Sequence, residues 1–292
     1  MSRTAWIGAL PAFVQRWLPR RLRQPAALPP RLWRWVLAQQ PFLSALTPPE
    51  QQRLQLLCRH FLAEKEFFGA NGLHISDAMA LTIAAQACLP LLHIAAVQAS
   101  RRHHELAALD WYADFVGIVV QPGAALAQRE VTDDNGVVHR YRELLAGEAM
   151  DRGPVMLSWQ DVSAASADGS NVVIHEFMHK IDMHGMSAGQ APDGAPALPP
   201  GFLGTLSAAQ AREHWRAVMQ ASYDRFCEAL KLAERFGAPS PWLNDYAATD
   251  PAEFFAVTCE AYFVDRARFA SEFPDLMPLY DGFFQAKRPL SA

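Results

Sequence analysis

The chain has 292 residues, of which 51% are hydrophobic, which is ample for a sizeable core and excludes a disordered protein. Its 26 Lys and Arg residues are outnumbered by 30 Asp and Glu residues, so the formal net charge is −4. This charge gives no electrostatic basis for direct nucleic-acid binding, which usually shows a basic excess. The four scattered cysteines form no C-x-x-C pair, so we expect buried, reduced thiols and a cytoplasmic setting.

The first 30 residues form a basic arm. Arginines follow its short apolar stretch, which is the reverse of the charge order in a signal peptide. We expect the arm, residues 1–30, to be poorly ordered; a short amphipathic helix that touches a membrane surface is the alternative. Residues 31–292 are predicted to form a single domain, with a helical part (31–110) followed by a part with a sheet (111–292).

Helical patterns dominate the first of these two parts. Residues 31–68 are predicted to be helical, with a helix start at residues 47–50, where two prolines follow Thr47. A second, apolar helix is predicted from Ser76 to His93. Polar residues and a proline interrupt its apolar run, so a buried helix fits better than a transmembrane one.

The second part begins with predicted strands. Residues 115–120 are rich in β-branched side chains and end at a Pro-Gly pair, and residues 153–159 show a similar short apolar run. The sequence Asp-Asn-Gly within residues 133–136 predicts a hairpin turn. If the strand at 153–159 lies at a sheet edge, an extended peptide could bind by adding to it; an ordinary structural strand is the alternative.

An H-E-x-x-H motif at residues 175–179 follows the last of these strands. On a helix, positions four apart stand on one face, so His175 and His179 can reach the same ion. Glu176 stands beside them and can take a proton from a metal-bound water. An accidental match on a helix surface is the alternative, but the apolar surroundings make unpaired polar groups costly there.

The residues on either side of the motif predict the bounds of its helix. Asp168 or Ser170 can serve as the N-cap, and Gly185 is a natural stop. Residues 185–206 are rich in Gly, Pro, Ala and Ser and predict a mobile loop, and residues 207–236 return to helix.

Zinc enzymes usually supply three protein ligands, so a third ligand is expected. The metzincin pattern requires Gly and His three and six residues after the second His, and Asp182 and Gly185 occupy those positions, which excludes that class. His184 points away from the two histidines by about a third of a turn on a helix, and is therefore a poor candidate.

A later apolar helix offers a better third ligand. Asp250 and Pro251 predict its start, and it carries Glu253 and Glu260, which are seven residues apart and so on one face. Buried carboxylates need a cation or hydrogen-bond donors, and a zinc ion with its histidines supplies both. Glu253 is thus a candidate ligand and Glu260 a candidate partner of a zinc-bound His. A capping-box role for Glu253 is the alternative.

The H-E-x-x-H motif, with N-D-Y-A-A-x-x-P-A-E-F-F-A at residues 244–256 and a second Glu, resembles the Mlc titration factor A family of zinc metallopeptidases. The resemblance extends upstream to G-P-V-M-L-S-W at residues 153–159 and F-L-A-E-K at residues 61–65, and covers most of residues 40–285. It implies an α+β, zincin-like fold of the gluzincin type, mostly helical with a small mixed sheet beside the motif helix, and related to the catalytic domain of anthrax lethal factor.

The resemblance also implies roles for single residues. His175, His179 and Glu253 would hold one Zn²⁺, Glu176 would be the general base and Tyr246 would stabilise the oxyanion. Two further carboxylates, Glu260 and Asp182, are taken as partners behind the ligands.

The activity that the resemblance implies is aminopeptidase-like cleavage of peptides in the cytoplasm. It also implies binding to the transcriptional repressor Mlc, and so a link to glucose uptake. A non-catalytic, zinc-containing protein that sequesters a repressor is the competing hypothesis. A metal hydrolase that acts on other substrates is a third.

Overall fold

Helices make up most of the described chain, and a small sheet accompanies them. The computed structural model describes residues 25–95, 102–123, 125–132, 138–145, 147–149, 153–164, 169–184, 186, 190–199 and 201–286. The α-helices are α3 (Pro30–Gln39), α4 (Pro41–Ser44), α5 (Pro48–Glu64), α6 (Asp77–Cys88), α7 (Trp159–Ser163), α8 (Val172–Met183), α9 (Ala208–Phe236), α10 (Pro251–Val264), α11 (Arg266–Glu272) and α12 (Met277–Phe284). The 3-10 helices are η2 (Leu89–Leu91), η3 (Ala107–Tyr112), η4 (Phe202–Gly204) and η5 (Asp245–Ala248). The strands are β1 (Glu66–Gly69), β2 (Gly117–Gln121), β3 (Ala125–Thr132), β4 (Val138–Leu145), β5 (Gly147–Ala149) and β6 (Val155–Ser158).

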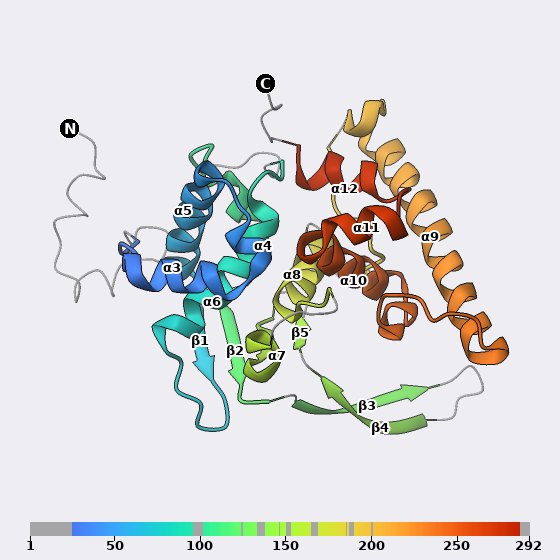
Figure 1. Ribbon diagram of the computed structural model, residues 1–292, viewed down its shortest axis with the longest axis horizontal. Coiled ribbons are helices and arrows are strands. Elements are labelled where there is room, and N and C mark those ends of the chain that lie inside the picture. Colours follow the sequence, from blue (N-terminus) through green and yellow to red (C-terminus); the bar gives the residue numbers. More distant parts are fainter. Residues whose placement is uncertain are drawn as a thin grey trace.

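The motif helix α8 lies at the centre of the molecule. Figure 1 shows α3 to α6 with β1 and β2 on one side of it and α9 to α12 on the other. Helix α8 packs against α10 and α6, and it also contacts β5 and β6. The α+β arrangement, with a small sheet beside the motif helix, is therefore as predicted.

The sheet is mixed, with the strand order β1-β2-β6-β5. Strands β1, β2 and β6 are parallel, and β5 is antiparallel to β6. Ile118 and Val120 of β2 are buried while their neighbours are half-buried, which is the alternation expected of a strand with one covered face. The hypothesis that residues 153–159 form an edge strand is wrong, because β6 lies between β2 and β5 and pairs with both. Strand β5 is too short to be recognised by alternation in the sequence.

The N-terminal part differs from the predicted helical run in two places. Within residues 31–68, three helices are followed by the strand β1, which pairs with β2, so the part 31–110 is not helical throughout. The helix predicted to reach His93 is α6, which ends five residues earlier. The 3-10 helix η2 follows it, at Pro90, which lacks the N–H that an α-helix would need.

The motif helix is capped by a residue other than those expected. The side chain of Asn171 accepts a hydrogen bond from the backbone N–H of Ile174, 2.9 Å away, so the N-cap is Asn171 and not Ser170. The other candidate cap, Asp168, and the expected stop, Gly185, lie outside the described residues. The helix α10 begins as predicted, with Pro251 in its first turn.

The described part of the loop 185–206 is anchored, unlike the mobile loop expected from its composition. The backbone N–H of Gly194 donates to Oδ2 of Asp182 on α8 at 2.8 Å. The indole N–H of Trp215 on α9 donates to the carbonyl of Gly194 at 2.7 Å. The neighbouring carboxylate of Asp193 pairs with arginine side chains of α9. These contacts join the segment 190–199 to two helices.

Several predictions fall outside what the structure describes. Most of the arm 1–30 does so, although Arg59 donates hydrogen bonds to the carbonyls of Ala26 and Pro25 at 3.1 and 3.2 Å. The hairpin predicted around residues 133–136 is formed by β3 and β4, and its turn is not described. The single domain stays a prediction. Among the described residues, no helix is both long and apolar enough to cross a membrane.

Candidate metal centre

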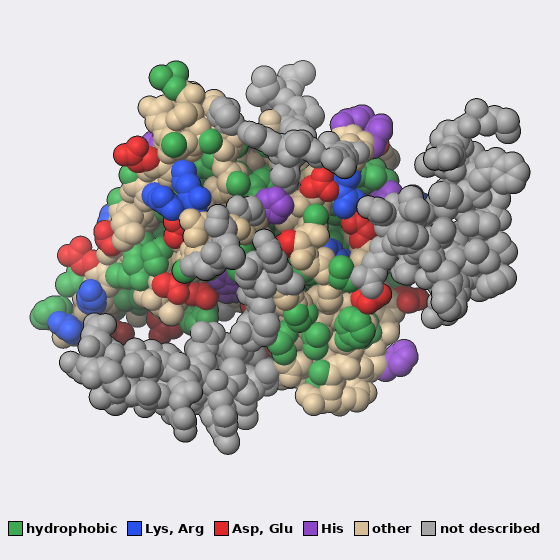
Figure 2. Space-filling model, turned by 180° about the vertical axis from the view of Figure 1, so that it is seen from behind, with side chains coloured by type: hydrophobic (Ala, Val, Ile, Leu, Met, Phe, Trp, Pro, Cys, Tyr) green, Lys and Arg blue, Asp and Glu red, His purple; other side chains and the backbone are tan. Residues whose placement is uncertain are grey.

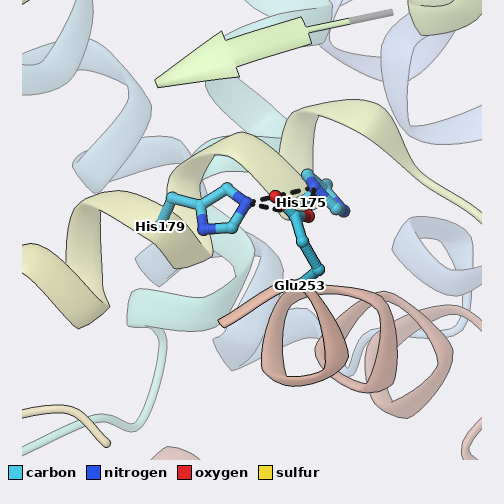
Figure 3. Close-up of side chains that lie close together, drawn as sticks. All are labelled: His175, His179 and Glu253. Carbon is cyan, nitrogen blue, oxygen red and sulfur yellow. Dashed lines mark hydrogen bonds and ion pairs between the residues drawn. The ribbon is translucent and has the colours of Figure 1, made fainter. Parts of the chain in front are cut away.

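The two histidines of the motif face each other from successive turns of α8. Their Nε2 atoms lie 3.2 Å apart, because residues four apart stand one above the other on a helix (Figure 3). The remaining candidate on this helix, His184, is its C-cap residue and packs against the ring of Trp111 at 5.0 Å between centroids. His184 is therefore not part of the group formed by His175 and His179.

The helix α10 brings Glu253 to the same point. Its Oε2 lies 3.0 Å from Nε2 of His175 and 3.3 Å from Nε2 of His179, as Figure 3 shows. The capping-box alternative is not supported, because the carboxylate of Glu253 faces the imidazoles. The cap is Asp250, whose Oδ1 accepts from the backbone N–H of Glu253 at 2.9 Å.

These three side chains fit a metal ion. Both imidazole nitrogens and the carboxylate oxygen offer lone pairs toward one point, and they are ligand atoms that zinc commonly takes. A tetrahedral zinc with bonds of about 2.0–2.1 Å separates its ligands by roughly 3.3 Å, close to the observed 3.0–3.3 Å. His175 is buried while His179 and Glu253 are half-buried, with side-chain exposures of 11%, 12% and 16%.

The second carboxylate of α10, Glu260, holds the far side of His175. Its Oε1 accepts a hydrogen bond from Nδ1 of His175 at 2.7 Å. An ionised carboxylate can only accept, so a proton belongs on Nδ1, which leaves Nε2, on the side of Glu253, as the nitrogen that can bind a metal ion. Glu260 therefore occupies the position expected of a partner behind a ligand, and it orients the imidazole.

The electrostatics of the cluster favour a cation. Burial by itself would lower the pKa of His175, but the carboxylates of Glu253 and Glu260 raise that pKa well above its usual value. Burial by itself would raise the pKa of Glu253, but the hydrogen bonds and charges of His175 and His179 hold that pKa well below the usual range of a carboxyl group. The carboxylates of Glu253 and Glu260 thus stabilise a positive charge at this buried position. A bound metal ion can supply that charge in place of the extra proton on His175.

The two residues expected to act on a substrate lie beside this group. Glu176 is buried on α8, close enough for its charge to raise the pKa of His175. Tyr246 is half-buried in η5, and its ring centroid lies 6.1 Å from that of His175. Figure 2 shows histidine side chains set back near the middle of one face, beside acidic side chains.

Asp182 lies three residues beyond His179 and is turned toward another segment. Its Oδ2 accepts from the backbone N–H of Gly194, and among the described residues no hydrogen bond joins it to a motif histidine. Burial raises the pKa of Asp182 to about 6, although the hydrogen bond from Gly194 opposes this. Its structural role is to anchor the segment 190–199 to α8.

Two buried polar residues near the site were not singled out in the sequence. Asn171, the cap of α8, donates from Nδ2 to Oε1 of Gln86 on α6 at 2.9 Å, and its backbone N–H donates to Glu260. The sequence signal for Gln86 is a lone amide in the apolar run of α6, because a buried amide requires a partner. The signal for Asn171 is its place directly before Val172, where Asn is a favoured cap.

The donor set and the helical scaffold define a candidate mononuclear metal centre. The chain belongs to the glucose-regulated metallo-peptidase M90 family, which matches residues 14–285. The resemblance seen in the sequence is thereby confirmed, and membership of a metallopeptidase family implies a metal ion.

Relatives with the name Mlc titration factor A match most of the chain. The protein from Cronobacter sakazakii is 30% identical over 267 residues, which is 91% of this chain and 90% of the relative. The protein from Escherichia fergusonii is 30% identical over 245 residues, covering 84% of this chain and 82% of the relative. The protein from Klebsiella pneumoniae is 30% identical over 254 residues, covering 87% and 85%.

Proposed function

We propose that this chain is a zinc-dependent peptidase of the gluzincin type, with a zincin-like fold. The observation that carries the proposal is the convergence of His175, His179 and Glu253 beside a buried Glu176, in a member of a metallopeptidase family. The first three residues would hold the zinc ion. When bound, zinc would polarise the scissile carbonyl and lower the pKa of its water.

Glu176 would serve as the general base. It would accept a proton from the attacking water and pass it to the leaving amine. Its burial on the same helix as the two histidines supports this role. The neighbouring phenol of Tyr246 would donate a hydrogen bond to the oxygen on which negative charge develops, and its position next to His175 supports that role.

The edge strand β5 offers a place for an extended peptide. Among the described strands it is the last of its sheet, and it contacts α8, so a peptide added to it would run near the helix that carries His175 and His179. The substrate is therefore proposed to be a peptide, and the family resemblance adds that cleavage is aminopeptidase-like. Assays with aminoacyl and internal-peptide substrates, with and without a chelator, separate these two modes of cleavage.

The names of the relatives favour an accompanying role in regulation. We propose that this chain binds the transcriptional repressor Mlc, and through it affects the genes of glucose uptake. The second candidate function is a protein that sequesters this repressor without needing catalysis. Neither function requires this chain to bind nucleic acid, and its formal net charge of −4 gives no electrostatic basis for such binding.

The substitution Glu176→Gln separates these functions. It removes the base but none of the three ligands, so peptide cleavage should fall at least about 100-fold while one zinc per chain is retained. The matched control is Glu234→Gln, an exposed position on α9, which should cleave at the normal rate. Unchanged cleavage by Glu176→Gln would contradict the peptidase. Binding of Mlc that survives Glu176→Gln would show that the repressor is bound independently of catalysis.

A further inference from the structure

A chain of buried hydrogen bonds links the ligand His175 to a side chain on a different helix. Nδ1 of His175 donates to Oε1 of Glu260 at 2.7 Å, and Oε2 of Glu260 accepts from the backbone N–H of Asn171. Nδ2 of Asn171 then donates to Oε1 of Gln86 at 2.9 Å. The chain thus starts on α6, passes the cap of α8, crosses to α10 and returns to α8 at the metal centre.

Every member of this chain is buried, which makes its geometry specific. The exposed fractions are 1% for Gln86, 6% for Asn171, 5% for Glu260 and 9% for His175. In such a low-dielectric place, hydrogen bonds are electrostatically strong and unpaired polar groups are costly. A displaced partner cannot be replaced readily by water, so each link fixes the next one.

The amide of Asn171 is the centre of the chain, because it makes two different hydrogen bonds. Its Oδ1 accepts from the backbone N–H of Ile174 at 2.9 Å, which starts α8. Its Nδ2 faces Gln86, whose oxygen can accept but whose nitrogen could not. Gln86 thereby fixes which end of the Asn171 amide faces α8, and with it the place of the backbone N–H that holds Glu260.

One end of the Gln86 amide is left without a hydrogen bond, which a purely structural role would not require. Its Nε2 is buried and has no hydrogen-bond partner among the described residues. An unsatisfied buried donor is destabilising, and an apolar side chain of similar volume would remove it, although Nδ2 of Asn171 would then lose its acceptor. The cost is consistent with a residue that serves the metal centre more than the stability of the fold.

We propose that Gln86 is a positioning residue of the metal centre, which acts through Asn171 and Glu260 to hold the imidazole of His175. The inference rests on the proposed zinc site. Gln86 does not touch the reacting atoms. Its effect is to keep Nε2 of His175 directed at the point that His179 and Glu253 also face.

The test is the zinc affinity of Gln86→Met, measured by competition with a chromogenic chelator, beside the melting temperature of the zinc-free protein. Partners behind a ligand typically change metal affinity 10–100-fold, so we expect about 10–100-fold for Glu260→Gln and about 3–10-fold for the more distant Gln86→Met. The zinc-free melting temperature of Gln86→Met should change little, because the substitution removes the unpaired Nε2 of Gln86 but leaves Nδ2 of Asn171 without its acceptor. The control Gln40→Leu, at another buried glutamine, should leave the zinc affinity unchanged.

A double variant tests whether the effect passes through the chain. In the Glu260→Gln background, Gln86→Met should weaken zinc binding by less than twofold, because its route to His175 is already altered. Independent, additive effects would overturn the proposal, as would a normal zinc affinity of Gln86→Met with a lower melting temperature. If Gln86→Met does not fold, Asn171→Ser replaces it, since Ser still caps α8 but lacks the amide nitrogen that donates to Gln86. Failure of the unaltered protein to bind zinc would instead contradict the proposed function.

Discussion

The first turn of α8 is held by side chains of other helices, whereas its last turns hold backbone groups of other segments. At the start, Glu260 and Gln86 reach His175 and Asn171. Both contacts are side-chain hydrogen bonds, so substitution of Glu260 or Gln86 removes them. The proposed ligand His175 is therefore held by side chains that substitution can replace one at a time.

The C-terminal half of α8 is the opposite case. Nζ of the fully buried Lys180 donates to the carbonyl of Gly153 at 2.9 Å, and Asp182 accepts from the N–H of Gly194 at 2.8 Å. Among the described residues, Nδ1 of His179 has no hydrogen bond comparable to that of His175. His175 is thus oriented by a hydrogen bond to its own ring, whereas the contacts of Lys180 and Asp182 near His179 hold the helix rather than the His179 ring.

The loss of a ligand should have the largest effect. The substitution Glu253→Ala leaves two imidazoles, so zinc affinity should fall by more than the about 100-fold that a partner behind a ligand can cost. Chelator competition measures it, with the exposed Glu234→Ala as the control. A Glu253→Ala protein that binds zinc as tightly as the unaltered one would show that α10 supplies no ligand.

Gly194→Ala should break the C-terminal anchor of α8. The backbone of Gly194 has a φ of +71°, and an added Cβ would lie 2.6 Å from the carbonyl oxygen of Pro251. We expect the free energy of unfolding to fall by about 3 kcal/mol, from backbone strain and overpacking together.

The control for Gly194→Ala is Gly237→Ala. Gly237 has nearly the same φ, +69°, but an added Cβ would meet nothing within 4 Å. It should therefore lose only about 1 kcal/mol, the part that is due to backbone strain. Chemical denaturation of both variants measures the difference, and equal losses would contradict a close approach of Gly194 to α10.

The smallest effect concerns the carboxyl of Asp182, whose pKa burial raises from 3.8 to about 6. Between these values the folded protein keeps a proton that the unfolded chain has lost, so the free energy of unfolding falls as pH rises. The slope is about 1.4 kcal/mol per pH unit within that window. Asp182→Asn lacks this contribution, so its stability curve should rise relative to that of the unaltered zinc-free protein between pH 3.8 and about 6. Parallel curves would contradict a buried, protonated Asp182.

The sequence predicts those parts of the site that a local pattern defines. His175 and His179 follow from helical spacing, and Glu253 follows from a buried carboxylate behind a recognised cap. Strand β5 and the partners of Gln86 could not be predicted, because they depend on how segments far apart in the chain pack together. The Gly and Pro content of residues 185–206 predicts a mobile loop. The hydrogen bonds with Asp182 and Trp215 that anchor the segment 190–199 depend on how α8 and α9 pack against it, so composition could not predict them.

We propose that α8 and α10 together hold one zinc ion. X-ray absorption at the zinc edge of the zinc-loaded protein tests this proposal. We expect nitrogen and oxygen ligands at about 2.0–2.2 Å, with the multiple scattering of two imidazoles, from His175 and His179, and no sulfur at about 2.3 Å. A sulfur ligand, or a signal from one imidazole only, would contradict the metal centre described for His175, His179 and Glu253.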